Sequence, residues 1–322
     1  MDFALNEDQL ELKQAARAWL ADRFPLDRDW ESTEDRWAEL AELGWLDVAE
    51  AGLGFVEEAL LLEELGYACY PGPYLATVGF ALPWLSAEQR ARVAAGEERW
   101  SVDVDGYVPW LGFVDFVVSD GGTAYPARGE DVASVDPSRP FGRLEKADGE
   151  PLAGNRNLPR ARTASAAEAL GVAQRALDLG VEHAKTRLQF GKPIGTYQAV
   201  SHPLAQTYTD VELARSLVYW AAWCVAEEDE AGSAGGKAAG ARPVDPAAFG
   251  GGGRAPLAAA AAKAFATEAA VAACERSIQV HGGIGFTWEH PLHRFYKRAL
   301  WLEGFGRRPA ELRLEVADAL LA

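Results

Sequence analysis

Apolar side chains in the first hundred residues recur every three to four positions, which is the spacing of amphipathic helices. The pattern predicts a first helix that starts after Asn6, a residue able to cap it, and runs past Trp19. Further helices are expected over residues 37–46, 57–67 and 86–95. Gly44 and Gly66 are expected to close the first two of these, and Ser86 to cap the third.

Beyond residue 99 the helical spacing gives way to short β-prone runs separated by glycine and aspartate. Strands are expected over residues 101–104, 107–110, 113–119 and 132–135. The turn signal Asp120-Gly121-Gly122 lies between the last two of these runs. The region ends near Pro159, so residues 99–159 are interpreted as a small β domain.

The helical spacing returns at residue 160, with helices expected over residues 164–187, 202–228, 257–280 and 311–322. Gly171 is interpreted as a packing contact within the first of these. Residues 229–256 are crowded with glycine and proline, which predicts a mobile loop. The chain therefore divides into an N-terminal helical domain (1–98), a reduced β domain (99–159) and a C-terminal helical domain (160–322), an α+β architecture.

Charge and cysteine content exclude several classes of function. The 322 residues carry a formal net charge of -17, so a nucleic-acid partner, which needs an excess of cations, is not expected. The three cysteines are far apart and form no C-x-x-C pair, so a disulfide framework is not expected. His281, His290 and His293 lie close in sequence, but no cysteine or carboxylate pattern accompanies them, and no metal site is expected.

The compartment expected from the sequence is the cytoplasm. The first twenty residues carry acidic groups throughout and no apolar run, which is unlike a secretory signal. No uninterrupted apolar stretch is long enough to span a membrane, so no membrane association is expected.

Two stretches of the C-terminal domain carry more specific information: RLQFGKPIGTYQ at residues 187–198 and QVHGGIGFTWEHP at residues 279–291. Both closely resemble the two C-terminal signatures of acyl-CoA dehydrogenases, in the same order and at a matching separation. The stretch LEELGYACYPGPYLATVGFAL resembles the corresponding N-terminal region of many bacterial members. The resemblance covers most of the chain, is weakest in the middle, and implies the family's helix–sheet–helix plan with a C-terminal four-helix bundle.

The resemblance also implies that these stretches contact an FAD molecule bound mainly by the neighbouring subunit. The guanidinium of Arg187 matches a pyrophosphate, the amide of Gln198 can donate or accept, and two glycines let the backbone approach a ligand. The cofactor-binding residues expected on this basis are Arg187, Phe190, Gln198, Gln279, Gly282 and Gly283. Alternatives stay open: a surface ion pair of Arg187 with Glu182 or Glu212, a helix C-cap at Gly282-Gly283, and a core position for Phe190.

Two parts of the family's usual site have no counterpart in the sequence. A flavin-binding segment like T-E-P-x-x-G-S-D is absent, and the β region is much shorter than usual. Gly306 stands where the family has its catalytic glutamate, and Ala161 where some members place the base instead. Glu303 and Glu168 are nearby acids, but an offset of one or two turns misplaces a carboxylate by several ångströms. No catalytic residue is therefore assigned.

The resemblance implies a subunit of an FAD-dependent acyl-CoA dehydrogenase that forms 2,3-enoyl-CoA. In the assembled enzyme a carboxylate removes the α-proton and the β-hydride passes to the flavin. The chain resembles the shorter, base-lacking subunit of heteromeric enzymes in bacterial steroid side-chain breakdown. A heterotetramer is therefore expected, with acyl-CoA in the pocket of a catalytic partner. Two alternatives stay open: a homo-oligomeric flavoenzyme with Glu303 as a displaced base, and a structural or interaction protein that binds no flavin.

Overall fold

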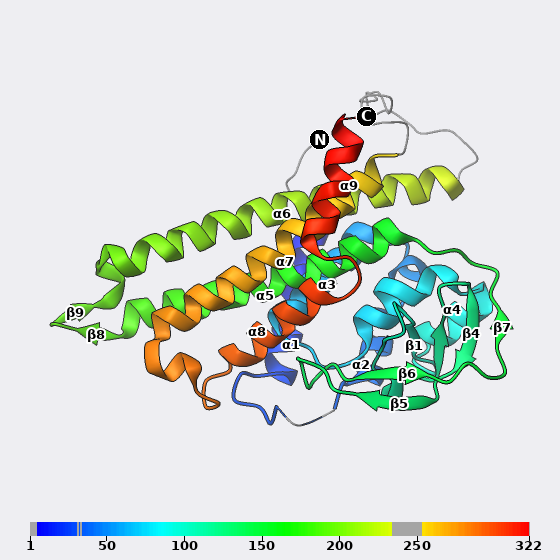
Figure 1. Cartoon of the computed structure of the whole chain (residues 1–322), viewed down its shortest axis with the longest axis horizontal. Helices are drawn as coiled ribbons and strands as arrows, with labels where there is room; N and C mark the ends of the chain where they lie inside the picture. The colour runs from blue at the N-terminus through cyan, green and yellow to red at the C-terminus, as the bar shows by residue number, and fades with distance from the viewer. Residues whose placement is uncertain (1–4, 31, 33, 234–252, 322) are drawn as a thin grey trace.

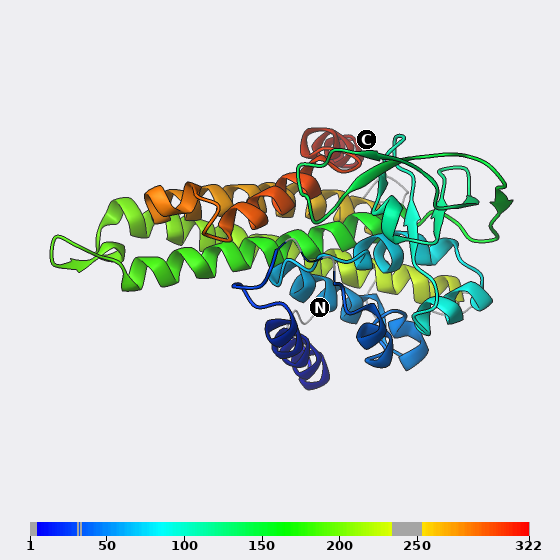
Figure 2. The same ribbon diagram turned by 90° about the horizontal axis from the view of Figure 1, so that it is seen from below.

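Three long helices set the shape of the molecule. The computed structural model describes residues 5–30, 32, 34–233 and 253–321. Figure 1 shows α5 (Leu158–Thr186), α6 (Gln198–Ser233) and α7 (Arg254–His281) side by side along the long axis, with the β region near one end. The view from below shows the N-terminal helix α1 (Glu7–Arg23) on the opposite side of α5 from the C-terminal helix α9 (Pro309–Leu321) (Figure 2). This arrangement confirms the expected α+β fold.

The N-terminal helices begin where the sequence predicts. The side chain of Asn6 accepts a hydrogen bond from the backbone N–H of Gln9, and the side chain of Gln9 accepts one from the backbone N–H of Asn6, so the capping box of α1 is complete. Ser86 and Gln89 form the same capping box at α4 (Ala87–Ala94). Between them lie α2 (Trp37–Glu42) and α3 (Phe55–Tyr67). A π-helical segment at Leu75–Ala81, which the sequence pattern did not predict, follows the Pro71-Gly72-Pro73 turn.

Two glycines bring α3 and α5 into backbone contact. A Cβ atom at Gly171 would lie 1.8 Å from the carbonyl oxygen of Glu63, so its interpretation as a packing contact is confirmed. Gly66 does not close α3, which continues through Tyr67. A Cβ atom there would lie 2.1 Å from the carbonyl oxygen of Glu168, so Gly66 also serves the close approach of the two helices.

The β region consists of two small sheets. One has the strand order β1-β3-β4-β7 and the other the order β2-β6-β5. The strands are β1 (Trp100–Val102), β2 (Val108–Pro109), β3 (Phe116–Val118), β4 (Thr123–Pro126), β5 (Gly129–Val132), β6 (Phe141–Leu144) and β7 (Glu150–Pro151). The strand expected over residues 132–135 is displaced to β5, and β4, β6 and β7 were not predicted. Strands of two to four residues are too short to establish an alternating pattern.

The C-terminal helices are longer than their periodic patterns. α6 continues to Ser233 and α7 begins at Arg254, so both ends of the expected loop 229–256 are helical. The rest of that loop lies outside the described residues. The helix α8 (Leu292–Gly304) was not predicted, although its buried residues follow a helical spacing. They are Leu292, Phe295, Arg298, Ala299, Trp301 and Leu302.

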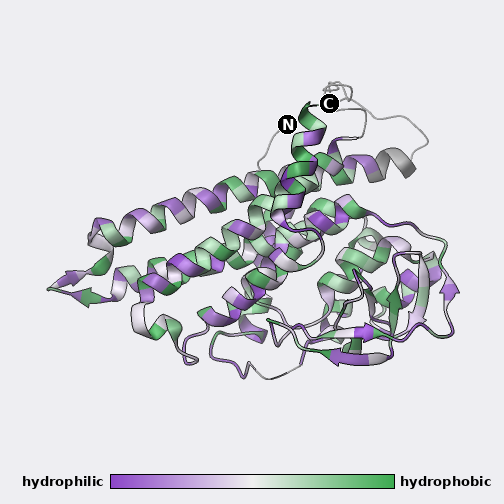
Figure 3. Cartoon of the chain, in the orientation of Figure 1, coloured by the Kyte–Doolittle hydropathy of each residue, from purple (hydrophilic) through white to green (hydrophobic). Residues whose placement is uncertain are grey.

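Helix α7 forms the centre of the core. Its buried face is built largely from alanine, which lets α5 pack closely against it. The stretch Arg254–Phe286 would satisfy the length and hydropathy of a membrane span, although no such stretch was expected from the sequence. Because 72% of its most apolar window is buried inside the fold, we interpret it as a core helix. α7 packs against α5, α6 and α8, and Figure 3 shows the hydropathy of these helices.

A buried ionic cluster ties the β region to the helices. Arg298 is fully buried on α8 and donates to Asp136 Oδ2 at 2.6 Å and to Glu168 Oε1 at 2.9 Å. It also donates to Ser138 Oγ and to the carbonyl oxygen of Tyr70. Arg139 forms a second ion pair with Glu168. One guanidinium thus holds four parts of the fold together: the loop that precedes β6, the connection after α3, α5 and α8.

Candidate functional site

The first motif forms a hairpin at the tip of the helical bundle. β8 (Leu188–Gln189) and β9 (Lys192–Pro193) pair antiparallel around a two-residue turn, Phe190-Gly191. Both turn residues have positive φ, 51° at Phe190 and 81° at Gly191, as the tightest hairpins require. The turn pushes the Phe190 side chain into solvent, where it is 92% exposed, which is against a core position for this ring.

The second motif lies at the same tip of the bundle. α7 ends at His281, and Gly282 is its C-cap with φ of 63°, so the C-cap interpretation of this glycine is correct. A Cβ atom at Gly282 or Gly283 would have no atom within 4 Å. Packing therefore does not demand glycine at either position, and the backbone of Gly283 is open to a ligand from outside.

Three neighbouring imidazole rings join the two motifs. The ring of His183, one turn before Arg187, lies 4.2 Å from the ring of His281, and His290 lies 4.3 Å from His281 on the other side. Burial, followed by the neighbouring histidines, lowers the pKa of His290 to about 4. Burial also lowers the pKa of His183 and that of His281, so the three rings are neutral at physiological pH and can lie together without repulsion.

The six expected cofactor residues thus gather at one end of the molecule, where Figure 1 shows β8 and β9. Arg187 and Gln198 are exposed, and Arg187 forms no ion pair with Glu182, Glu212 or any other described residue. Large apolar side chains are exposed at the same tip. They are Leu188, Phe190, Ile284, Phe286 and Trp288. An exposed apolar group of this kind, beside an unpaired arginine, is typical of a surface that another molecule covers.

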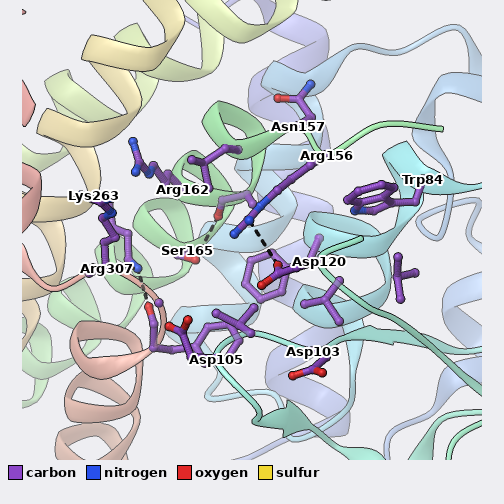
Figure 4. Close-up of a pocket in the computed structure, with 18 of the residues that line it drawn as sticks. Trp84, Asp103, Asp105, Asp120, Arg156, Asn157, Arg162, Ser165, Lys263 and Arg307 are labelled. Carbon is purple, nitrogen blue, oxygen red and sulfur yellow. Dashed lines mark hydrogen bonds and ion pairs between the residues drawn. The ribbon is translucent and has the colours of Figure 1, made fainter. Parts of the chain in front are cut away.

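A cavity of about 590 Å³ lies at the other end of the bundle, between the start of α5, the β region and the loop that joins α8 to α9. None of the six expected cofactor residues lines it. Figure 4 shows its side chains, with Arg156 directed toward Asp120 and Lys263 beside Arg307. Most of its charged groups are in ion pairs: Arg162 and Arg307 with Glu315, Arg156 with Asp120, and Lys146 with Asp103.

Both positions at which the resemblance would place a catalytic base line this cavity. Gly306 has φ of 70°, and a Cβ atom there would lie 3.5 Å from the Nζ atom of Lys263. That ammonium is 5% exposed and donates to the carbonyl oxygens of Phe305 and Arg307, on either side of Gly306. Ala161 lines the cavity from α5. The ammonium of Lys263 thus lies beside Gly306, one of these two positions.

The two acids considered as substitutes point elsewhere. Glu303 does not line the cavity. Burial, and then the carboxylates of Glu268 and Glu275, raise the pKa of Glu303, which places its side chain beside α7. Glu168 is buried between Arg139 and Arg298.

Lys263 is a buried charged residue of the cavity that the sequence reasoning did not single out. Burial lowers the pKa of its ammonium to about 8, with a smaller contribution from Arg162. The signal was present in the sequence, because Lys263 is the one charged residue within the apolar run Leu257–Thr267. A lysine in such a run requires polar partners, and here they are backbone carbonyl groups.

Comparisons with known proteins identify both halves of the chain. Residues 6–95 match the family "Acyl-CoA dehydrogenase, N-terminal domain" and residues 148–306 match "Acyl-CoA dehydrogenase, C-terminal domain". The chain is 33% identical to acyl-CoA dehydrogenase IpdE2 of Mycobacterium tuberculosis over 79% of its length and 74% of that protein. It is 32% identical to acyl-CoA dehydrogenase FadE34 of the same organism over 85% of its length, but spans only 41% of that protein.

Solved structures share the whole fold. The steroid acyl-CoA dehydrogenase Tcur3481–Tcur3483, as a G363A variant, superposes with a TM-score of 0.82 and 26% identity over 98% of both chains. The ChsE4–ChsE5 complex from Mycobacterium tuberculosis superposes with a TM-score of 0.79 over 100% of this chain and 99% of that one. Its identity of 22% supports the likeness of fold alone.

Proposed function

The chain belongs to the acyl-CoA dehydrogenase family, oxidoreductases that act on a CH–CH group, and we propose that it is a non-catalytic subunit of such an enzyme. In this proposal it contributes the adenine and pyrophosphate side of an FAD site to a catalytic partner in a heterotetramer. The partner supplies the base, the flavin pocket and the pocket in which acyl-CoA becomes 2,3-enoyl-CoA.

The observation that carries the proposal is the separation between the two ends of α5. Arg162, on its first turns, lines the cavity, and Arg187 follows its last residue. Twenty-five residues of helix correspond to about 37 Å at the rise of an α-helix. The motif residues and the cavity of one chain therefore serve different sites. A cofactor that touches the motif would then be seated in another chain.

The exposed motif residues fit an FAD molecule presented from outside. Arg187 has a free guanidinium fork suited to a pyrophosphate, and Phe190 offers an exposed ring face. Gln198 and Gln279 are exposed amides, and the open backbone at Gly283 permits close approach. Bound flavin supplies a hydride acceptor, whereas the role of these residues is to bind and orient its nucleotide end.

The contacts of Lys263 support the proposed lack of a catalytic base in this chain. The ammonium of Lys263 binds the two carbonyl groups that flank Gly306. These hydrogen bonds fix the loop at a position where the residue has no side chain. Of the four carboxylates that line the cavity, Asp103, Asp120 and Glu315 are ion-paired, and Asp105 lies on an exposed turn. Among the described residues, Asp105 is thus the one lining carboxylate outside an ion pair, and it lies neither at Gly306 nor on α5, where the family's base is expected.

The names of the similar structures support a mixed oligomer. Two different chains appear in the names Tcur3481–Tcur3483 and ChsE4–ChsE5, and the former is a steroid acyl-CoA dehydrogenase. By this analogy we propose a cytoplasmic heteromer that acts in the breakdown of a steroid side chain or related lipid. The exposed apolar side chains beside Arg187 would form part of the contact with the partner.

The test is a substitution at Arg187 in the complex co-expressed with its partner. A charge-assisted hydrogen bond contributes about 1.5–3 kcal/mol, so Arg187→Ala should weaken FAD binding about tenfold to a hundredfold. Arg187→Lys should restore only part of the affinity, because an ammonium lacks the fork. The matched control is Arg313→Ala, which removes an exposed arginine on α9. Unchanged FAD retention in Arg187→Ala would contradict the proposal.

A further inference from the structure

A separate cavity of about 270 Å³ lies between α1, α3 and α5. It shares no lining residue with the cavity near Lys263 and includes none of the residues at the tip of the bundle. One wall is apolar and is formed by α1 and the turn that follows it. Its residues are Leu20, Ala21, Phe24, Pro25 and Leu26.

The polar wall carries two guanidinium groups, Arg17 from α1 and Arg175 from α5, around the ring of Tyr67. The Cζ atom of Arg17 lies 3.5 Å from the centre of the Tyr67 ring, and that of Arg175 lies 4.7 Å from it. The two cations are therefore within about 8 Å of each other. The one carboxylate on this wall, Glu64, binds Arg17 through both of its oxygens.

Arg175 has no carboxylate in contact with it. Its Nη1 donates to the hydroxyl oxygen of Tyr67 at 2.8 Å, and that hydroxyl donates to Asp178 Oδ2 at 2.9 Å. The other oxygen of Asp178 accepts from Gln174. Within the part of the chain that the structure describes, neither Nε nor Nη2 of Arg175 donates a hydrogen bond. The cavity thus holds two positive charges and one negative charge, in a protein of net charge -17.

We propose that this cavity binds a small amphiphilic carboxylate. The carboxylate group would accept from Nη2 of Arg175, whose charge lacks a direct counterion. The short hydrocarbon chain would lie against the apolar wall of α1. A guanidinium favours a carboxylate because both are planar and can form parallel hydrogen bonds.

The class of ligand follows from the apolar wall and the polar wall taken together. Inorganic phosphate would satisfy the arginine but leave the apolar wall in contact with water. An aliphatic alcohol would cover the apolar wall but leave the cation uncompensated. The cavity volume is near the lower end for small-molecule sites, which favours a chain of a few carbons over a long acyl group. This inference does not depend on the proposed function, because the cavity contains none of that site's residues.

The test is isothermal titration calorimetry of the purified full chain with hexanoate, hexanol and inorganic phosphate. Hexanoate should bind, and hexanol and phosphate should bind at least about tenfold more weakly, since each satisfies one wall only. Equal binding of hexanol or of phosphate would overturn the amphiphilic carboxylate, and so would the absence of hexanoate binding.

Two variants locate the site. Arg175→Gln should weaken hexanoate binding at least about tenfold, because it removes the charge. Ala21→Phe keeps both arginines and fills the cavity from its rim, so it should also abolish binding if the site lies here. Arg143→Gln, on β6 and outside this cavity, is the matched control and should bind like the parent chain. Retention of full binding in a folded Ala21→Phe or Arg175→Gln variant would overturn the proposal.

Discussion

Removal of the Arg298 side chain should destabilise the whole fold. In Arg298→Met the apolar replacement occupies much of the same space, but Asp136 and Glu168 lose a buried counterion. Breaking a buried ion pair by removal of one partner costs about 3–5 kcal/mol. The entropy of unfolding for 322 residues is about 0.7 kcal/mol/K, so the expected fall in Tm is about 4–7 °C.

Differential scanning calorimetry of the full chain measures this change. The control is Arg313→Met, which breaks an exposed ion pair with Glu268 and should cost less than about 1 kcal/mol. Burial alone would raise the pKa of Asp136, but Arg298 and Arg139 outweigh it and hold the pKa below its usual range. The cluster should therefore stabilise the protein above about pH 4 and lose this effect as the pH falls further. A Tm of Arg298→Met equal to that of the control would refute the reasoning.

Three further predictions concern helix packing, protonation and the base. Gly171→Ala should cost about 1–3 kcal/mol by overpacking against α3, whereas Gly112→Ala, with open space around it, should leave the Tm unchanged. His290 should stay neutral to about pH 4 in a proton NMR titration. Between about pH 6.5 and pH 4 the unfolded state binds more protons than the folded state, so the stability of the fold should decrease as the pH drops through this range. A titration midpoint near 6.5 would contradict the burial of this ring. Glu303→Gln should leave turnover of the co-expressed complex nearly intact, and loss of flavin reduction with full flavin content would identify Glu303 as a displaced base.

The sequence predicts most of the helices because their signals are local. Asn6 and Ser86 cap helices through hydrogen bonds with residues only three positions away, so the capping pattern is visible in the sequence itself. Gly66 was misread for the opposite reason. Its role is to admit the carbonyl group of Glu168, which lies far away along the chain and is close only in the fold.

The candidate site shows the same division between local and distant information. The two motifs identify the residues at the tip of the bundle, and the hairpin turn follows from Phe190-Gly191. The place of Lys263 beside Gly306 depends on the packing of α7 against the loop that follows α8. That loop could not be placed without α8, a helix that was not predicted because its pattern adjoins the motif ending at Pro291.

The flavin content of the chain with and without its partner tests the central claim most directly. The chain purified alone and the chain co-purified with a full-length catalytic homologue would each pass through gel filtration, followed by measurement of FAD absorbance against protein. The account predicts almost no FAD on the chain alone, because its motif residues lie at one tip of the bundle and none of them lines the cavity near Lys263. It predicts stoichiometric FAD in the complex. Near-stoichiometric FAD in an oligomer of this chain alone would contradict it.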